Sequence, residues 1–335
     1  MTMYHWDLPE VLHQLNGWTN PDSVQWFDNY SRIIVEQFGD RVKHMITFNE
    51  PSIFTKKGYQ EGTYAPGWKC DNDTLVRIVH YILLAHGKAV QNVRNKFSDI
   101  KVGITLANSP MVPFSSKPED VMQAYESQIF TGDTGEYWLY GMKMWGDPLF
   151  FGKYPEKYLE GIGKNLIINE GDMECISQPI DFLGLNTYSG TYVYVDHWAP
   201  KFVYRKRGQS INSLLWTTIP ESLYYVTKYF YDEYKCPIYI TENGFCDNDS
   251  ISLDGNVHDP LRVDFYKRYL EQLKKAKDEG IDIRGYFTWS LMDNFEWNEG
   301  YDPRFGLVYI DYEDNNKRIP KDSFYWYKDF IQSQS

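Results

Sequence analysis

The sequence predicts an α/β protein in which helices cover a parallel sheet. Strand-like and helix-like segments alternate along the 335 residues. Two apolar strand-like runs end in a glutamate, Glu50 and Glu242, and Pro51 or Gly244 follows closely as a chain breaker. Alternation of this kind is typical of parallel sheets, and such folds place their chemistry at the carboxyl ends of the strands.

Six core strands are expected from short runs rich in apolar and β-branched residues. They cover residues 2–5, 44–48, 101–106, 180–185, 238–241 and 284–289. A closed eight-stranded barrel needs two more strands, although the chain is long enough for such a fold. Residues 307–312 and 317–320, around Asn315 and Asn316, indicate a small hairpin.

Helices are expected between the strands, at residues 21–38, 74–96, 119–130, 135–144, 221–234, 259–279 and 322–331. The first is predicted to have Asn20 as its cap, Pro21 in its first turn and Gly39 after its end. Its expected apolar stripe is Val24, Phe27, Ile34 and Phe38. The stripe expected for helix 74–96 is Leu75, Ile78, Val79, Ile82, Leu83, Ala89 and Val93.

Composition narrows the range of partners. The formal net charge of -12 argues against nucleic acid, which needs clustered Lys and Arg. No apolar run approaches the ~18 residues that a membrane span requires. The chain holds 11 Trp, 28 Tyr and 19 Phe, and aromatic rings with polar edges suit the flat C–H faces and hydroxyls of sugars. Core packing explains most of these rings equally well.

Hydrolysis of a glycosidic bond requires at least two carboxyl groups, which the two glutamates at strand ends can provide. Their motifs, Thr-Phe-Asn-Glu-Pro at 47–51 and Ile-Thr-Glu-Asn-Gly at 240–244, resemble the two signatures of glycoside hydrolase family 1, the β-glucosidase family. Four further segments are similar to family motifs and follow in family order, at 4–9, 181–188, 286–297 and 304–312. The resemblance covers essentially the whole chain, in the style of an animal or insect enzyme. It implies a single catalytic domain over residues 1–335, of the (β/α)8 TIM-barrel type.

The resemblance also implies a retaining two-glutamate mechanism. Glu242 would be the nucleophile and Glu50 the general acid and then base, with carboxyl groups about 5–5.5 Å apart. Ionised Glu242 would keep Glu50 protonated through like-charge repulsion, and formation of the glycosyl ester would remove that repulsion. The alternative interpretation is a pair of unrelated surface or salt-bridged glutamates.

Further roles are carried over from the family motifs. Asn49 would contact the sugar 2-OH, and Tyr188 would hydrogen-bond and orient the nucleophile. The expected substrate-binding residues are His5, Trp6, Asn49, Trp216, Trp289, Glu296, Trp297 and Phe305. Each of these tryptophans could instead be core packing, and His80 and His86 are expected to satisfy core hydrogen bonds. No cofactor or metal is expected, and none of the four cysteines forms a CxxC pair.

The chain departs from the family at its start. Family members usually begin about a hundred residues earlier, with the first two barrel strands and part of the third. That region supplies a glutamine for the glycone and an arginine beside the nucleophile. We therefore expect an N-terminally truncated β-glucosidase, whose incomplete barrel has open edges through which it could self-associate.

The interpretation most favoured is a β-glucosidase-type enzyme that hydrolyses terminal, non-reducing β-D-glucosyl residues of small or oligosaccharide β-glucosides, in carbohydrate metabolism. The alternatives are a non-catalytic sugar- or partner-binding relative and an inactive fragment. Glu50 argues against the plant type of thioglucosidase, which carries Gln at that position. The aglycone, and the choice among glucose, galactose and fucose, stay open. Localisation is also open: residues 1–7 have no signal-peptide character, although a full-length relative is expected to be secreted.

Overall fold

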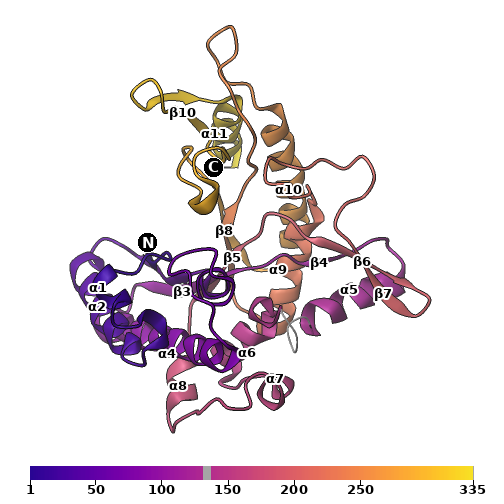
Figure 1. The fold of residues 1–335 in the computed structure, drawn as a ribbon. Coiled ribbons are helices and arrows are strands. Elements are labelled where there is room, and N and C mark those ends of the chain that lie inside the picture. Colours follow the sequence, from indigo (N-terminus) through magenta and orange to yellow (C-terminus); the bar gives the residue numbers. More distant parts are fainter. Residues whose placement is uncertain (131–136, 335) are drawn as a thin grey trace. The chain divides into compact units, whose positions relative to one another are not determined.

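A six-stranded sheet has the order β1-β2-β3-β5-β8-β9 in the structure, a computed structural model that describes residues 1–130 and 137–334 (Figure 1). All six expected core strands are present, within two residues of the predicted bounds. They are β1 Thr2–Tyr4, β2 His44–Asn49, β3 Lys101–Ala107, β5 Phe182–Asn186, β8 Ile238–Asn243 and β9 Ile283–Thr288. The prediction of an α/β sheet is therefore confirmed strand by strand.

The first four strands of this order pair in parallel, so their carboxyl ends meet at one edge. Thr2 pairs with Ile46 across β1 and β2, and Ala107 pairs with Asn186 across β3 and β5. The β3–β5 approach is close, because a Cβ added at Gly103 would lie 2.4 Å from the carbonyl oxygen of Phe182. A glycine is therefore required at this point of the sheet.

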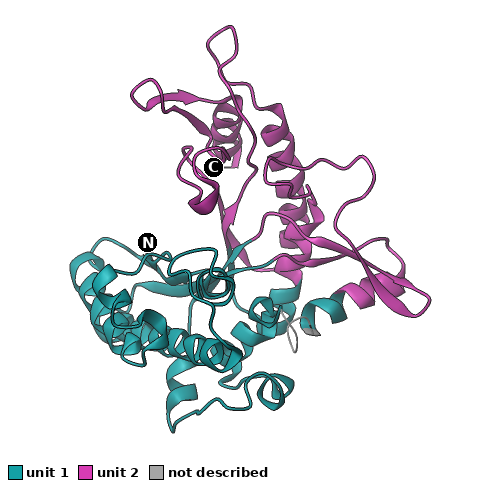
Figure 2. Ribbon diagram, viewed as in Figure 1, with its two compact units in different colours: residues 1–108, 125–186, 229–239 teal, residues 109–124, 187–228, 240–335 magenta. Residues whose placement is uncertain are grey.

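The chain divides into two compact units, shown in teal and magenta in Figure 2. Unit 1 comprises residues 1–108, 125–186 and 229–239, and unit 2 comprises 109–124, 187–228 and 240–335. Strand β8 begins in unit 1 and ends in unit 2. The expectation of a single catalytic domain over residues 1–335 stays a prediction.

Unit 1 is built around two long helices, α2 Ser23–Phe38 and α4 Asn72–Lys96. The apolar stripe expected for α4 is confirmed, since all seven of its residues are buried. The stripe expected for α2 is partly wrong: Val35 and Ser31 are buried, whereas Phe38 is exposed. Ser31 can be buried because its hydroxyl donates to the carbonyl of Asp28 and accepts from the Asn92 amide.

The helix expected at residues 135–144 differs from the observed structure. Its first two residues lie outside the described residues, and a 3₁₀ turn at Trp138–Tyr140 precedes helix α6, Met142–Phe151. The remaining helical elements with residues in unit 1 are α1 Glu10–His13, a 3₁₀ turn Gly17–Thr19, α3 Pro51–Phe54, a π-helical segment Thr55–Glu61, the last part of α5 Pro118–Phe130, α7 Glu156–Glu160, α8 Asp172–Ile176 and the last part of α9 Glu221–Tyr234.

Unit 2 contains a three-stranded sheet that was not expected from the sequence. Its order is β4-β6-β7, from Met111–Pro113, Thr191–Asp196 and Ala199–Val203. The expected hairpin is confirmed as β10 Val308–Asp311 paired with β11 Lys317–Pro320. The helical elements with residues in unit 2 are the first part of α5, the first part of α9 Glu221–Tyr234, α10 Pro260–Asp278, a 3₁₀ turn Trp297–Glu299 and α11 Asp322–Gln334.

Within the part of the chain that the structure describes, no helix combines the length and apolar character that crossing a membrane requires.

Candidate active site

Glu50 lies in unit 1, directly after β2, where the chain turns into helix α3. Its backbone is left-handed, with φ 49°, an uncommon conformation for a non-glycine residue that is found at functional sites. Pro51 occupies the first helical position, which suits its fixed φ. The Glu50 N–H donates to the Thr105 carbonyl at 2.9 Å, and the residue is only 8% exposed.

An asparagine at the end of β5 holds the Glu50 carboxyl group. Nδ2 of Asn186 donates to Oε1 of Glu50 at 2.9 Å and to Oδ1 of Asn49 at 3.0 Å. One amide therefore fixes the two neighbouring side chains at the carboxyl end of β2. Glu50 thereby receives a donor on one of its two carboxyl oxygens, which a carboxylate accepts well.

Two candidate residues beyond β1 contact Asn49. Nε1 of Trp6 donates to the Asn49 carbonyl at 3.0 Å, and Nδ2 of Asn49 lies 3.3 Å from Nε2 of His5. Trp6 has a left-handed backbone with φ 76°. Burial lowers the pKa of His5, so its ring is neutral at pH 7 and can exchange hydrogen bonds with hydroxyl groups. Unit 1 thus brings together His5, Trp6, Asn49, Glu50 and Asn186.

Tyr140 lies in the electrostatic field of this group. Burial raises the pKa of its hydroxyl, and the negative charges of Glu61 and Glu50 raise it further, so the hydroxyl stays protonated. Nζ of Lys56 sits 5.1 Å from the ring centres of Tyr137 and Tyr140, within the π-helical segment that follows α3. Such π-helical turns are frequent at functional sites.

Glu242 lies in unit 2, next to the end of β8. Oη of Tyr188 donates to Oε2 of Glu242 at 2.7 Å. The Tyr188 ring packs against Trp216 and Phe305, with ring centres 5.4 and 5.8 Å away, and the latter two rings lie 6.1 Å apart. Four predicted site residues are therefore adjacent in this unit.

Backbone and side-chain hydrogen bonds fix the end of β8. The Thr187 N–H donates to the Glu242 carbonyl at 3.1 Å, and the Asn243 amide donates to the Thr187 carbonyl at 2.6 Å. Tyr286 donates to Oδ1 of Asn243 at 2.7 Å. The backbone of Glu242 and the side chain of Asn243 are thus both held, which limits the movement of the Glu242 carboxylate.

The last three predicted sugar-binding residues follow β9. The backbone N–H of Trp289 donates to the carbonyl of Asn243, the residue after Glu242, at 2.9 Å. Glu296 and Trp297 lie in the loop between β9 and β10, where Trp297 has a left-handed φ of 47°. Glu296 N–H donates to the Gly300 carbonyl at 2.7 Å, which closes a turn at the tip of this loop.

The expected separation of Glu50 and Glu242 stays a prediction, since the two residues belong to different units. Among residues 1–130 and 137–334, no group of His, Cys, Asp and Glu side chains is arranged to hold a metal ion. The side chains described above provide carboxylates, amides, phenols, indoles and the imidazole of His5.

A sequence profile of glycosyl hydrolase family 1 matches residues 1–335. The chain belongs to glycosyl hydrolase family 1. It is 42% identical to "Beta-glucosidase A" of Thermotoga maritima and to "1,4-beta-D-glucan glucohydrolase" of Thermotoga neapolitana, in each case over 99% of this chain and 73% of the relative. Both relatives are bacterial, so the animal or insect style expected from the motifs stays a prediction.

The fold agrees with a solved structure of the family. The family 1 β-glucosidase from Thermotoga maritima in complex with isofagomine lactam matches with a TM-score of 0.86 and 41% identity, over 99% of this chain and 73% of that one. The (β/α)8 type of fold is thereby confirmed. The described residues of this family 1 chain provide six of the eight core strands of such a barrel.

Two residues near the site were not predicted as site residues. Asn186 ends β5 as Asn49 ends β2, and this shared position was a signal in the sequence. Tyr140 had no comparable signal, because only the folding of distant segments brings it near Glu50. His80 and His86 are core residues: His80 contacts Tyr154 and Asp172, and His86 contacts Thr47.

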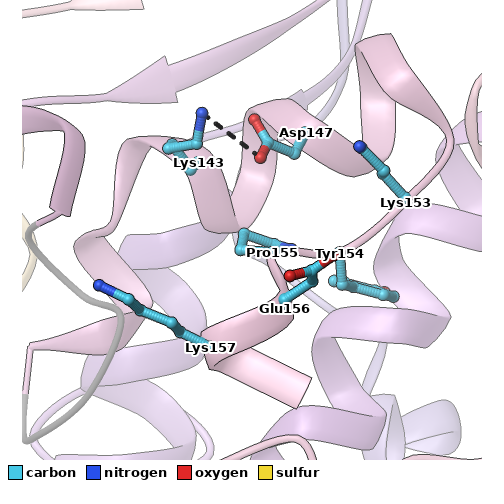
Figure 3. Close-up of a pocket in the computed structure, with 7 residues that line it drawn as sticks. All are labelled: Lys143, Asp147, Lys153, Tyr154, Pro155, Glu156 and Lys157. Carbon is cyan, nitrogen blue, oxygen red and sulfur yellow. Dashed lines mark ion pairs between the residues drawn. The ribbon is translucent and has the colours of Figure 1, made fainter. Parts of the chain in front are cut away.

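Unit 1 also contains a surface hollow of about 260 Å³ (Figure 3). It is lined by Lys143, Asp147, Lys153, Tyr154, Pro155, Glu156 and Lys157. Lys143 Nζ lies 3.6 Å from Oδ2 of Asp147, the ion pair drawn in Figure 3. None of the predicted site residues lines this hollow, so we assign it no role in the chemistry.

Proposed function

We propose that this protein is a retaining β-glucosidase that hydrolyses terminal, non-reducing β-D-glucosyl residues. The observation that carries the proposal is the hydrogen bond from Tyr188 to Glu242, found in a family 1 chain. A phenol donor stabilises the carboxylate form and restricts its orientation, as a nucleophile requires. The burial of Glu50 and its contact with Asn186 give further support.

In the first step, a carboxylate oxygen of Glu242 attacks the anomeric carbon. The bond from that carbon to the aglycone oxygen breaks, and Glu50 gives its proton to the departing oxygen. Glu242 is now a neutral glycosyl ester, and Glu50 is a carboxylate. The aglycone leaves as an alcohol.

In the second step, Glu50 removes a proton from water, and the resulting hydroxide oxygen attacks the same carbon. The ester bond breaks, Glu242 regains its charge, and glucose leaves with its original β configuration. The Asn49 amide is proposed to bond the 2-OH. The hydrogen bond from Asn186 to this amide, and the one from Trp6 to the Asn49 backbone carbonyl, hold the residue in place for this role. His5, Trp6, Trp289, Glu296, Trp297 and Phe305 are proposed to bind the glycone, and Trp216 the aglycone.

The test is release of chromophore from an aryl β-glucoside, with Glu242→Gln and Glu50→Gln as variants. We expect turnover by the native chain and a loss of at least ~10³-fold in kcat for Glu242→Gln. The matched control is Glu36→Gln, which alters an exposed glutamate of α2 and should leave activity unchanged. Proton NMR of the first product should show β-glucose, because two displacements retain configuration.

Circular dichroism of each variant separates loss of chemistry from loss of folding. A folded native chain that releases no chromophore, yet binds a glucose-like inhibitor, would favour the alternative of a non-catalytic sugar-binding relative. A chain that does not fold alone would favour the alternative of an inactive fragment. A first product of inverted configuration would contradict the role proposed for Glu242.

A further inference from the structure

Six charged side chains form a buried network within unit 2. They are Asp249, Asp259, Arg262, Asp293, Arg304 and Lys321. Arg262 is 1% exposed and Lys321 is 0% exposed. Three carboxylates face three cations, so the network is balanced in charge. Buried charges are tolerated only when they are paired in this way, and their removal one at a time is costly.

Lys321 joins two segments of the candidate site. It lies between β11 and α11, and its Nζ donates to Oδ2 of Asp249 at 2.5 Å and to Oδ1 of Asp293 at 2.8 Å. Asp249 belongs to the segment that follows β8, the strand of Glu242. Asp293 belongs to residues 290–306, named the 290–306 loop, which carries Glu296 and Trp297.

Asp293 holds both ends of the 290–306 loop. Its Oδ1 also accepts the Gly306 N–H at 2.9 Å, and its Oδ2 accepts from Nη1 of Arg304 at 2.9 Å. A Cβ added at Gly306 would lie 2.1 Å from the Asp293 nitrogen, so the two ends of the loop touch. The position of Asp293 therefore determines the position of the loop that Glu296 and Trp297 occupy.

Arg262 makes a second connection between the same segments. Its Nε donates to the Phe245 carbonyl at 2.8 Å, and its Nη2 donates to the Arg304 carbonyl at 2.6 Å. Phe245 follows Glu242 by three positions, whereas Arg304 is in the 290–306 loop.

We propose that Lys321 is a positioning residue that holds the 290–306 loop against the segment following Glu242. Lys321 acts through Asp293 and Asp249 and has no contact with the sugar. The catalytic consequence rests on the proposed function, in which Glu296 and Trp297 bind the glycone. Displacement of the loop would then weaken binding of the sugar and its discrimination at the hydroxyl groups, more than it would alter the chemical step.

Hydrogen exchange in peptides that cover residues 290–306 tests the positioning directly. Lys321→Met keeps an unbranched side chain of similar length to the aliphatic part of lysine and removes the ammonium group. We expect exchange in this loop to become roughly tenfold faster, because its local opening becomes easier. The matched control is Lys317→Met, four positions earlier, where the side chain is 62% exposed and its pairing with Asp314 spans 3.7 Å. That variant should leave exchange in the loop unchanged.

A double variant separates positioning from charge balance. Lys321→Met leaves one carboxylate in excess, whereas Lys321→Met with Asp249→Asn restores neutrality without restoring the connection. We expect the double variant to regain part of the lost stability and to keep the fast exchange in the loop. Native exchange in the double variant would show that only charge balance matters, and it would overturn the proposal.

Kinetics with aryl β-glucoside and aryl β-galactoside give the functional measurement. For Lys321→Met we expect KM to rise roughly tenfold with kcat changed less than about threefold, and the preference between the two sugars to decrease. Equal losses on both sugars, or unchanged exchange in the loop, would overturn the proposal. If the native chain turns over neither sugar, the proposed function fails, and the exchange experiment still decides whether Lys321 holds the loop.

Discussion

The phenol of Tyr188 donates a hydrogen bond to Oε2 of Glu242, with 2.7 Å between the two oxygens. Tyr188 is itself held in place, because its carbonyl accepts from Oη of Tyr269 at 2.9 Å. Tyr188 follows β5 by two residues, and Glu242 lies within β8. The ends of these two strands are therefore joined through the proposed nucleophile.

Replacement of this phenol tests its role. Tyr188→Phe should lower kcat by about 10²-fold and change KM less, because the donor serves the reacting carboxylate. The measurement is steady-state hydrolysis of an aryl β-glucoside. The control is Tyr204→Phe, at an exposed tyrosine of unit 2, which should leave kcat and KM unchanged. An unchanged kcat for Tyr188→Phe would remove the orienting role from this residue.

Asn186 offers a test through the pH profile. Asn186→Asp places a carboxylate where an amide now lies 2.9 Å from Glu50. A like charge makes ionisation of Glu50 less favourable, so Glu50 should stay protonated to higher pH. We expect the basic limb of the kcat/KM profile to move to higher pH and the maximal rate to fall. A basic limb that stays in place would contradict the assignment of Glu50 as the general acid.

Much of the fold could be predicted from local patterns, since each core strand is a compact apolar run. The three-stranded sheet β4-β6-β7 could not, because β4 has only three residues and pairs with β6 about eighty positions later. The apolar stripe of α2 was misplaced because Ser31 is buried through hydrogen bonds that tertiary packing provides. Periodicity alone contains no information about such a partner.

Site residues could be predicted from the sequence where they lie at the ends of strands. Glu50 and Glu242 could be found in this way, and Asn186 occupies an equivalent position that was not assigned a role. Lys321 could not be found, because a lysine in a polar segment is expected at the surface. Only the structure places its ammonium group between Asp249 and Asp293.

The buried network predicts a large difference between two arginines of helix α10. Arg262→Met leaves Asp249 and Asp259 without their guanidinium and should cost about 3–5 kcal/mol of unfolding free energy. Arg268→Met removes an exposed pair with Asp264 on the same helix and should cost about 0–1 kcal/mol. Urea unfolding followed by circular dichroism gives both values. Equal costs would show that burial of the network contributes nothing to stability.

The hydrogen bonds of His258 predict that the stability of the fold depends on pH. Its ring lies 2.7 Å from Asp322 and 3.1 Å from Asp254, and these hydrogen bonds raise the pKa of His258 above its ordinary value of 6.5. A raised pKa stabilises the fold fully below about pH 6.5, and this stabilisation disappears as the pH rises through the raised value. His258→Gln should therefore lower Tm more at pH 5.5 than at pH 9.

Melting curves at the two pH values measure this difference. His197→Gln is the control, since that ring is exposed and lies 3.7 Å from Asp196. The prediction for His258 is wrong if the loss in Tm is the same at both pH values.

The position of strand β9 in the sheet predicts that the protein self-associates. It stands last in the strand order of the sheet, and Phe287 in this strand is 57% exposed. An apolar side chain on a strand with one neighbouring strand favours pairing with a second copy. We expect the molecular mass measured by light scattering to rise with concentration, and Phe287→Lys to suppress that rise because a charged side chain opposes strand pairing.

Ile331→Lys, at an exposed apolar residue of helix α11, is the control for this experiment. Equal suppression by both variants would attribute the association to general surface hydrophobicity, and a constant mass at all concentrations would contradict association through β9.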